Sequence, residues 1–228
     1  MKSLPADKRA RKRFRYHLWV AFISLAATTS LYGVLSLVYP SPQSVIFRWS
    51  LATGYVGAAL LAVTLSLGAW KILRGRSNPV STDLRRDIGI WCGILSIAHV
   101  VVGLNVHMKS WTLYFVTETG GLRTDFFGFA NYLGLAATLV VVVLLATSND
   151  FSLTVLKSNR WKAIQRWNYV FAVLVALHAF LFIVVEKRVV PFVIILGAFA
   201  IWTLIIQAVG FQKRRQSLTE ARATAVSE

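Results

Sequence analysis

Residues 167–185 read WNYVFAVLVALHAFLFIVV, a stretch with a single side chain that titrates near neutral pH. At about 1.5 Å per residue, a helix of this length crosses most of the roughly 30 Å hydrocarbon core of a lipid bilayer. Five other stretches have similar length and apolar character. The sequence therefore predicts an all-α, polytopic membrane helix bundle whose six transmembrane helices cover about 16–38, 49–70, 88–107, 129–147, 167–185 and 189–209.

The composition of the whole chain agrees with this prediction. Hydrophobic residues make up 56% of the 228 residues, charged residues only 15%, and the mean hydropathy is +0.60. A net charge of +16 raises the question of nucleic acid, but the basic residues fall between long apolar runs and do not form one cluster. We therefore expect a lipid bilayer and no nucleic acid as a partner. The single cysteine, Cys92, leaves no intramolecular disulfide to form.

Basic residues are distributed unequally between the two predicted sides of the membrane. The side that holds both termini carries 20 Lys and Arg residues, and the opposite side carries 5. By the positive-inside rule, both termini are expected in the cytoplasm, with a bacterial inner membrane as the expected location. The expected organisation is a basic segment at 1–15, a helical domain at 16–210 and a polar tail at 211–228.

Histidines are the only ionisable groups with neutral-pH chemistry that lie deep in the predicted spans. Acidic and basic side chains are absent from the middle of all six, which counts against a proton-coupled carrier. His99 lies 13 residues after Arg86, and His178 lies 12 residues after Arg166. Both are therefore expected at nearly the same depth, about 18–20 Å from the inner edge. Two level imidazoles suit the axial ligation of one haem iron, although each histidine could instead hydrogen-bond a neighbouring helix.

A further histidine and several basic residues lie nearer the outer side. His107, at the end of the expected span 88–107, is expected about 12 Å outward of His99, too far to bind the same iron from the same helix. It is a candidate for binding a haem propionate or for assisting at a quinone or substrate site, and it is equally explained as a helix-end residue. Arg123 is a candidate for pairing a propionate, as are Arg48 and Lys109, although each is also explained as a loop charge.

Two motifs carry a resemblance to a known family. Leu84-Arg85-Arg86-Asp87-Ile88-Gly89-Ile90 leads into His99, and Arg160-Trp161-Lys162-Ala163-Ile164-Gln165-Arg166 leads to Tyr169 and His178. Over about residues 50–210 the chain resembles the ferric-reductase-like transmembrane domain family, whose superfamily includes NADPH oxidases, ferric reductases and the haem membrane subunit of a periplasmic methionine sulfoxide reductase system. The resemblance implies transmembrane electron transfer through haem b, held by His99 and His178.

The chain also departs from that family. Members with two stacked haems have inner histidines about 13 residues before the later ligand and 14 before the earlier one, where this sequence has Gln165 and Arg85. We therefore expect one haem, in the outer half of the membrane. The sequence shows no flavin or nicotinamide domain, so membrane quinol, a separate reductase or a periplasmic redox partner is the expected electron donor or acceptor. The alternative is a non-redox transporter or scaffold built on the same fold.

Overall fold

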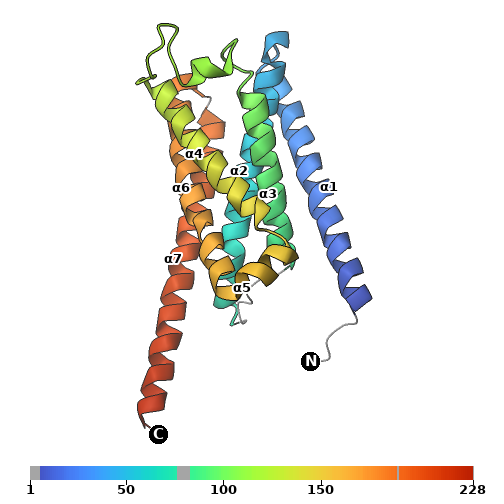
Figure 1. Cartoon of the computed structure of the whole chain (residues 1–228), viewed down its shortest axis with the longest axis vertical. Coiled ribbons are helices and arrows are strands. Elements are labelled where there is room, and N and C mark those ends of the chain that lie inside the picture. Colours follow the sequence, from blue (N-terminus) through green and yellow to red (C-terminus); the bar gives the residue numbers. More distant parts are fainter. Residues whose placement is uncertain (1–5, 76–82, 189, 228) are drawn as a thin grey trace.

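The computed structural model describes residues 6–75, 83–188 and 190–227, and within these residues all regular structure is helical (Figure 1). The α-helices are α1 (Ala6–Val38), α2 (Val45–Leu73), α3 (Asp83–Gly103), α4 (Phe126–Ala146), α5 (Asp150–Gln165), α6 (Trp167–Glu186) and α7 (Val190–Ser227). Six stretches of the described helices are long and apolar enough to cross a membrane. The predicted all-α membrane bundle with six spans is therefore confirmed.

Parts of the predicted segments are not described. Residues 1–5 of the expected basic N-terminal segment, 76–82 of the basic loop, 189 at the start of the last expected span and 228 of the tail lie outside the described residues.

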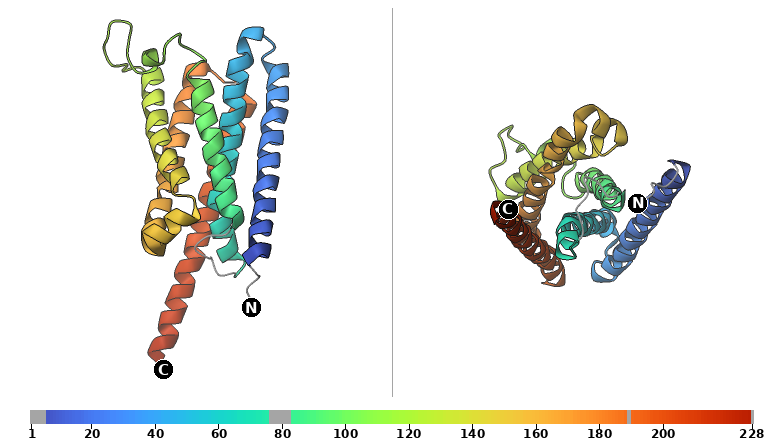
Figure 2. Two further views of the ribbon diagram at one scale, coloured as in Figure 1. Left: turned by 45° about the vertical axis from the view of Figure 1, so that its right-hand side comes forward. Right: turned by 90° about the horizontal axis from the view of Figure 1, so that it is seen from below.

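Helix α2 lies at the centre of the arrangement. It packs against α1, α3 and α7, while α4 packs against α6 and α3 joins the two groups. Figure 2 shows α1 on one side of the bundle, away from α4 and α6. Helix α1 begins and α7 ends at the same end of the bundle, and α5 lies across that end (Figure 1). We call it the basic end, and we call the opposite end, formed by residues 104–125, the loop end.

The surface of the bundle is rich in large apolar side chains. Phe22 in α1 is 65% exposed, Leu139 in α4 64% and Leu204 in α7 70%. In water such a surface would be costly, because burial of apolar area is the main favourable term in folding. Lipid tails remove this cost, so the exposed helices are those of an integral membrane protein.

The boundaries of several helices differ from the prediction. Helix α1 begins ten residues earlier than expected, and α7 continues without interruption beyond position 210 to Ser227. Helix α3 ends at Gly103, so the expected continuation to 107 is wrong, and His107 lies in the loop that follows. The buried Tyr114 explains this end: its hydroxyl donates to the carbonyl of Gly103 at 2.9 Å and accepts the backbone N–H of His107 at 2.9 Å. The helix end is thereby satisfied without another turn.

The polar connection expected between the fourth and fifth spans forms helix α5. Asn149 caps its start by accepting the backbone N–H of Ser152 at 2.7 Å. Lys157 interrupts it with φ 57° and ψ 164°, so the helix is kinked. Trp161 holds the second half against the bundle, because its indole is buried and its Nε1 donates to the carbonyl of Thr147 at 2.9 Å. Helix α5 thus closes the basic end.

The last two spans form a tight hairpin, as the three residues between their predicted ranges of 167–185 and 189–209 imply. Helix α6 ends at Glu186, Lys187 adopts a left-handed conformation with φ 46°, and α7 begins at Val190. Pro191 lies in the first turn of α7, where its missing N–H costs no helical hydrogen bond.

Candidate functional site

The structure brings His99 of α3 and His178 of α6 together in the bundle core. The centroids of the two imidazole rings are 6.1 Å apart, and the ring planes are nearly perpendicular, at 88°. They come from helices that lie far apart in the sequence but share the central packing of α2, α3, α4 and α6. The two residues singled out by their depth in the sequence therefore occupy one site.

Each imidazole is oriented by a backbone carbonyl of a neighbouring helix. Nδ1 of His99 lies 2.9 Å from the carbonyl oxygen of Ser50 in α2, and Nδ1 of His178 lies 2.8 Å from that of Ala130 in α4. A carbonyl oxygen only accepts, so each Nδ1 carries the proton and donates it. The lone pair of each ring then lies on Nε2. This is the arrangement that metal-binding histidines adopt, with one nitrogen donating to the protein and the other facing the metal.

Glycines make both of these hydrogen bonds accessible. Gly54 follows Ser50 by four residues, and Gly134 follows Ala130 by four. In an α-helix the side chain at such a position leans back over the turn that carries the earlier carbonyl. A Cβ at Gly54 would lie 3.0 Å from Nδ1 of His99, and one at Gly134 would lie 2.9 Å from Nδ1 of His178. On both α2 and α4, a glycine therefore leaves the space that a histidine ring needs to reach a backbone carbonyl.

The two histidines share a cavity of about 280 Å³, which we call the histidine cavity. Most of its lining is apolar, and Gly54 and Gly134 form part of the wall. Ser96 and Gly103 of α3 also line it. Toward the basic end the cavity is closed by Leu61, Val141 and Phe171, which are also buried in the main core.

A cluster of three ionisable residues lines the loop end of the histidine cavity. His107 Nε2 lies 3.0 Å from Oε1 of Glu186, and Nε of Arg188 donates to Oε2 of Glu186 at 2.8 Å. The ring of His107 also stacks on Phe182, with centroids 6.1 Å apart and an angle of 19°. His178, Phe182 and Glu186 follow each other at intervals of four on one face of α6. This face connects the site to the cluster.

Sequence reasoning did not identify Glu186 and Arg188. Both lie in the short connection between the last two predicted spans. For Glu186 the available signal is its spacing of eight residues from His178 on α6, and Arg188 has no such signal. Arg188 also lies over the ring of Tyr55, 5.9 Å from its centroid. These contacts depend on how α6 and α7 return to α2, which hydropathy does not report.

The candidate Arg123 lies outside the cavity lining. Its guanidinium donates to both carboxylate oxygens of Asp125, at 3.2 and 2.7 Å, and to the carbonyl of Leu113. Asp125 in turn accepts the backbone N–H of Gly128 and caps α4. The hydrogen bonds from Arg123, followed by that from Gly128, hold the pKa of Asp125 below its usual value. Arg123 therefore organises the start of α4.

The candidate Arg48 is likewise engaged away from the histidines. Its Nη1 donates to the carbonyls of Tyr39 and Ser41, and its guanidinium lies 5.4 Å from the ring centroid of Tyr32. These contacts tie together α1, α2 and the connection between them. Lys109 does not line the histidine cavity.

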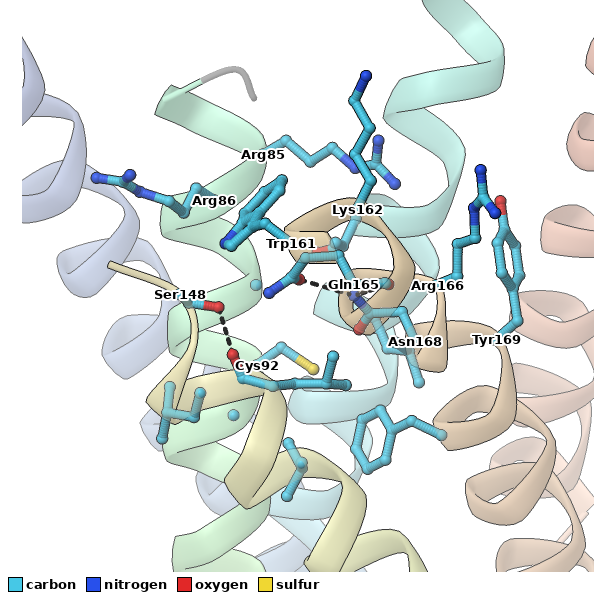
Figure 3. Close-up of a pocket in the computed structure, with 18 of the residues that line it drawn as sticks. Arg85, Arg86, Cys92, Ser148, Trp161, Lys162, Gln165, Arg166, Asn168 and Tyr169 are labelled. Carbon is cyan, nitrogen blue, oxygen red and sulfur yellow. Dashed lines mark hydrogen bonds between the residues drawn. The ribbon is translucent and has the colours of Figure 1, made fainter. Parts of the chain in front are cut away.

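A second cavity of about 650 Å³ lies at the basic end (Figure 3). Both positions where two-haem relatives have inner histidines, Arg85 and Gln165, line this cavity. Leu61, Val141 and Phe171 line both cavities, so one layer of apolar side chains separates them. We call the second cavity the basic cavity, because five of its lining residues are Arg85, Arg86, Lys162, Arg166 and Arg214.

The described part of the chain contains no cluster of side chains that could bind a metal ion without another ligand. No group of three or more His, Cys, Asp or Glu residues lies close enough to hold an ion. Protein-bound zinc, for comparison, takes three or four protein ligands. Two histidines by themselves fit a metal whose other ligands come from a macrocycle.

Comparison with known proteins identifies the family of the chain. The sequence model of a family described as "Ferric reductase like transmembrane component" matches residues 53–176, which is more than half of the 228 residues. The match begins in α2, contains His99 and ends two residues before His178. No curated protein matches the chain. The family indicates a role in membrane electron transfer, and the chain belongs to the ferric-reductase-like transmembrane family.

Proposed function

We propose that this chain is a membrane electron-transfer protein that holds one haem b between His99 and His178. The observation that carries the proposal is the pair of Nδ1–carbonyl hydrogen bonds, because they orient two imidazoles in one cavity and leave both Nε2 atoms available. A pair of ordinary interhelical hydrogen bonds would not by itself require the two rings to lie 6.1 Å apart.

The site fits haem in three respects. The two imidazole rings lie close enough together, with centroids 6.1 Å apart, that His99 and His178 could both hold one prosthetic group. The cavity walls are mostly apolar, which suits the body of a macrocycle. Gly54 and Gly134 keep both histidine rings close to the helix backbones. When bound, haem supplies reversible one-electron chemistry, with a potential that depends on its ligands and burial.

The residues of the chain would set the orientation of the ligands, the access of water and the charge near the haem. The carbonyls of Ser50 and Ala130 fix the tautomer and orientation of the two ligands. The apolar wall limits the access of water, and the Glu186 carboxylate with its two partners supplies fixed charge near the loop end. Since the cluster already pairs its acid and its bases, a propionate at His107 or Arg188 would have to compete with Glu186.

The distribution of basic residues supports one orientation of the bundle in the membrane. We propose that the basic end faces the cytoplasm, in a bacterial inner membrane, because Lys and Arg concentrate on cytoplasmic loops. The histidine cavity would then lie in the outer half. Electrons would reach or leave it through membrane quinol, a separate reductase or a periplasmic partner.

Haem content tests this function directly. The full chain is purified in detergent after haem-replete expression, and the reduced-minus-oxidised spectrum is recorded with haem quantitation. We expect one low-spin haem b per chain, lost in His99→Ala and in His178→Ala. His17→Ala is the matched control, because His17 lies at the α1–α3 contact, 3.6 Å from Asp87, and lines neither cavity. A well-folded wild-type protein without haem would favour the transporter or scaffold alternative.

A further inference from the structure

Helices α2 and α7 pack together as they approach the basic end, and α7 continues past the bundle there (Figure 1). Gly210 of α7 is buried so closely against α2 that a Cβ at this position would lie 2.7 Å from that of Ala69. Beyond this contact, Nζ of Lys213 donates to the carbonyl of Leu73 at 3.3 Å. We call the line along which the two helices meet the α2–α7 seam. The helices are held together along it up to Leu73, the last residue of α2.

Two tryptophans are exposed along the α2–α7 seam. Trp202 of α7 is 52% exposed, and its Nε1 donates to Oγ of Ser66 in α2 at 3.1 Å. Trp70 follows Ser66 by about one turn of α2 and is 40% exposed. Indole rings are enriched where the apolar tails of a bilayer meet its headgroups. The seam therefore presents aromatic surface to lipid close to the end of the membrane span.

Positive charge gathers where the α2–α7 seam ends. The guanidinium of Arg74 lies over the indole of Trp70, 4.9 Å from the ring centroid. The cations at the end of α2 and in the adjoining turn of α7 are Lys71, Arg74, Lys213, Arg214 and Arg215. None of these five forms an ion pair with another described residue. Helix α2 contains no acidic residue and the first in α7 is Glu220, so the end of the seam lacks a counter-ion from either helix.

An anionic phospholipid matches both parts of the α2–α7 seam. A guanidinium binds phosphate through paired hydrogen bonds, and basic residues between transmembrane helices attract anionic headgroups. Because both helices run toward the basic end, Trp70 and Trp202 precede the cations and lie nearer the middle of the membrane, where an acyl chain runs. A free phosphate ion would contact the cations and leave the aromatic surface unoccupied. The combination therefore favours a lipid over a soluble anion.

We propose that the α2–α7 seam binds one anionic phospholipid in the leaflet at the basic end. The phosphate lies between Arg74 and Lys213, and an acyl chain runs along Trp70 and Trp202. None of these four residues lines the histidine cavity or the basic cavity. The lipid site is therefore separate from the proposed haem site, and its binding does not depend on haem. Because the lipid contacts both helices, it holds α7 against α2 and stabilises the folded protein.

Phosphatidylglycerol and phosphatidylcholine with identical acyl chains are the matched probes, because they differ in headgroup charge. The full chain is delipidated in a nonionic detergent and titrated with each lipid, and bound lipid is counted by native mass spectrometry. We expect one tightly bound phosphatidylglycerol per chain, with an affinity at least about tenfold above that of phosphatidylcholine. Its binding should also raise the unfolding temperature. Equal affinities for the two lipids would indicate annular lipid only and would overturn the proposal.

Substitutions locate the bound lipid. Arg74→Gln together with Lys213→Gln should weaken phosphatidylglycerol binding about tenfold or more and leave that of phosphatidylcholine unchanged. Arg15→Gln together with Arg160→Gln is the control, because it removes two exposed cations of the basic end, from α1 and α5, and should leave both affinities unchanged. Unfolding temperatures of the lipid-free proteins verify that each variant folds. Unchanged phosphatidylglycerol binding in the folded seam variant would also overturn the proposal.

A soluble anion tests whether the acyl chain contributes. Glycerol 3-phosphate carries the phosphate without acyl chains, so it should not displace phosphatidylglycerol at an equal concentration. Displacement would indicate an anion site alone and would overturn the assignment to a lipid. The same titrations separate this proposal from the proposed function. A wild-type protein with one haem and no lipid preference would overturn the lipid site alone, and a haem-free wild-type protein that binds the lipid would overturn the proposed function alone.

Discussion

Gly54 lies against the imidazole of His99, so closely that a Cβ at this position would be 3.0 Å from both Nδ1 and Cε1 of the ring. Gly134 bears the same relationship to His178. These contacts are tighter than ordinary van der Waals distances, and both glycines and both histidines line the histidine cavity. The glycines are therefore positioning residues for the two proposed ligands.

Gly54→Ala and Gly134→Ala should each displace one imidazole and weaken its hydrogen bond to the carbonyl. We expect partial loss of haem, with a shifted or broadened spectrum of the part retained, because ligand orientation is altered. Absorption spectra and haem quantitation measure both effects. Gly197→Ala serves as the control, because nothing lies within 4 Å of a Cβ at that position in α7. Wild-type spectra in both cavity variants would contradict the positioning role.

Glu186 and Arg188 should tune the potential of the proposed haem in opposite directions. Glu186 is paired with Arg188 and His107, so we treat it as an ionised carboxylate that favours the more positive oxidised state. Glu186→Gln should raise the midpoint potential, and Arg188→Gln should lower it. Shifts of tens of millivolts are expected, since a tenfold change in a one-electron equilibrium corresponds to about 59 mV. Redox titration followed by absorbance measures them, and shifts of the same sign would contradict this interpretation.

Asp125 should stabilise the loop end both as a helix cap and as the partner of Arg123. Asp125→Ala removes both contributions and should cost about 1 kcal/mol at neutral pH, mainly from the cap. Asp125→Asn keeps a capping oxygen and should cost less, because the carboxylate is exposed and its ion pair is screened by solvent. Thermal unfolding in detergent compares the three proteins.

The pH dependence of this contribution follows from the lowered pKa of Asp125. Arg123 holds the pKa in the folded protein below the unfolded value of about 3.9, so the stabilisation is complete above that value. It is lost as the pH falls through the lower pKa of the folded state. The difference between wild type and Asp125→Asn should therefore be the same at pH 7 and pH 5, and disappear only on stronger acidification. A difference already lost at pH 5 would contradict the assignment.

Restoring the missing inner histidines should test whether the basic cavity retains the shape of a haem site. Arg85 and Gln165 both line this cavity, from α3 and α5. Arg85→His combined with Gln165→His should raise the haem content from one to two per chain, with two components in a redox titration. Gln165→His alone is the control, since it supplies one imidazole only. A folded double variant that keeps one haem would show that the cavity has lost that shape.

Hydropathy and spacing predicted the features that depend on chain length alone. Six spans, the tight turn after Glu186 and the common depth of His99 and His178 follow from helix rise and membrane thickness. The end of α3 at Gly103 was not predictable in this way, because it depends on a hydroxyl from Tyr114 in the next loop. The role of Gly54 and Gly134 was also not predictable, because it depends on contacts with histidines of other helices, and the sequence does not show which helices are neighbours.

The shared wall of Leu61, Val141 and Phe171 has a consequence for energy conservation. Electrons cross a thin layer of packed side chains by tunnelling, whereas a proton or a hydrated ion would need polar groups or water to cross it. The layer offers neither, because all three side chains are hydrocarbon. If the proposed electron transfer holds, this apolar layer would let an electron pass while hindering the movement of protons through the centre of the bundle.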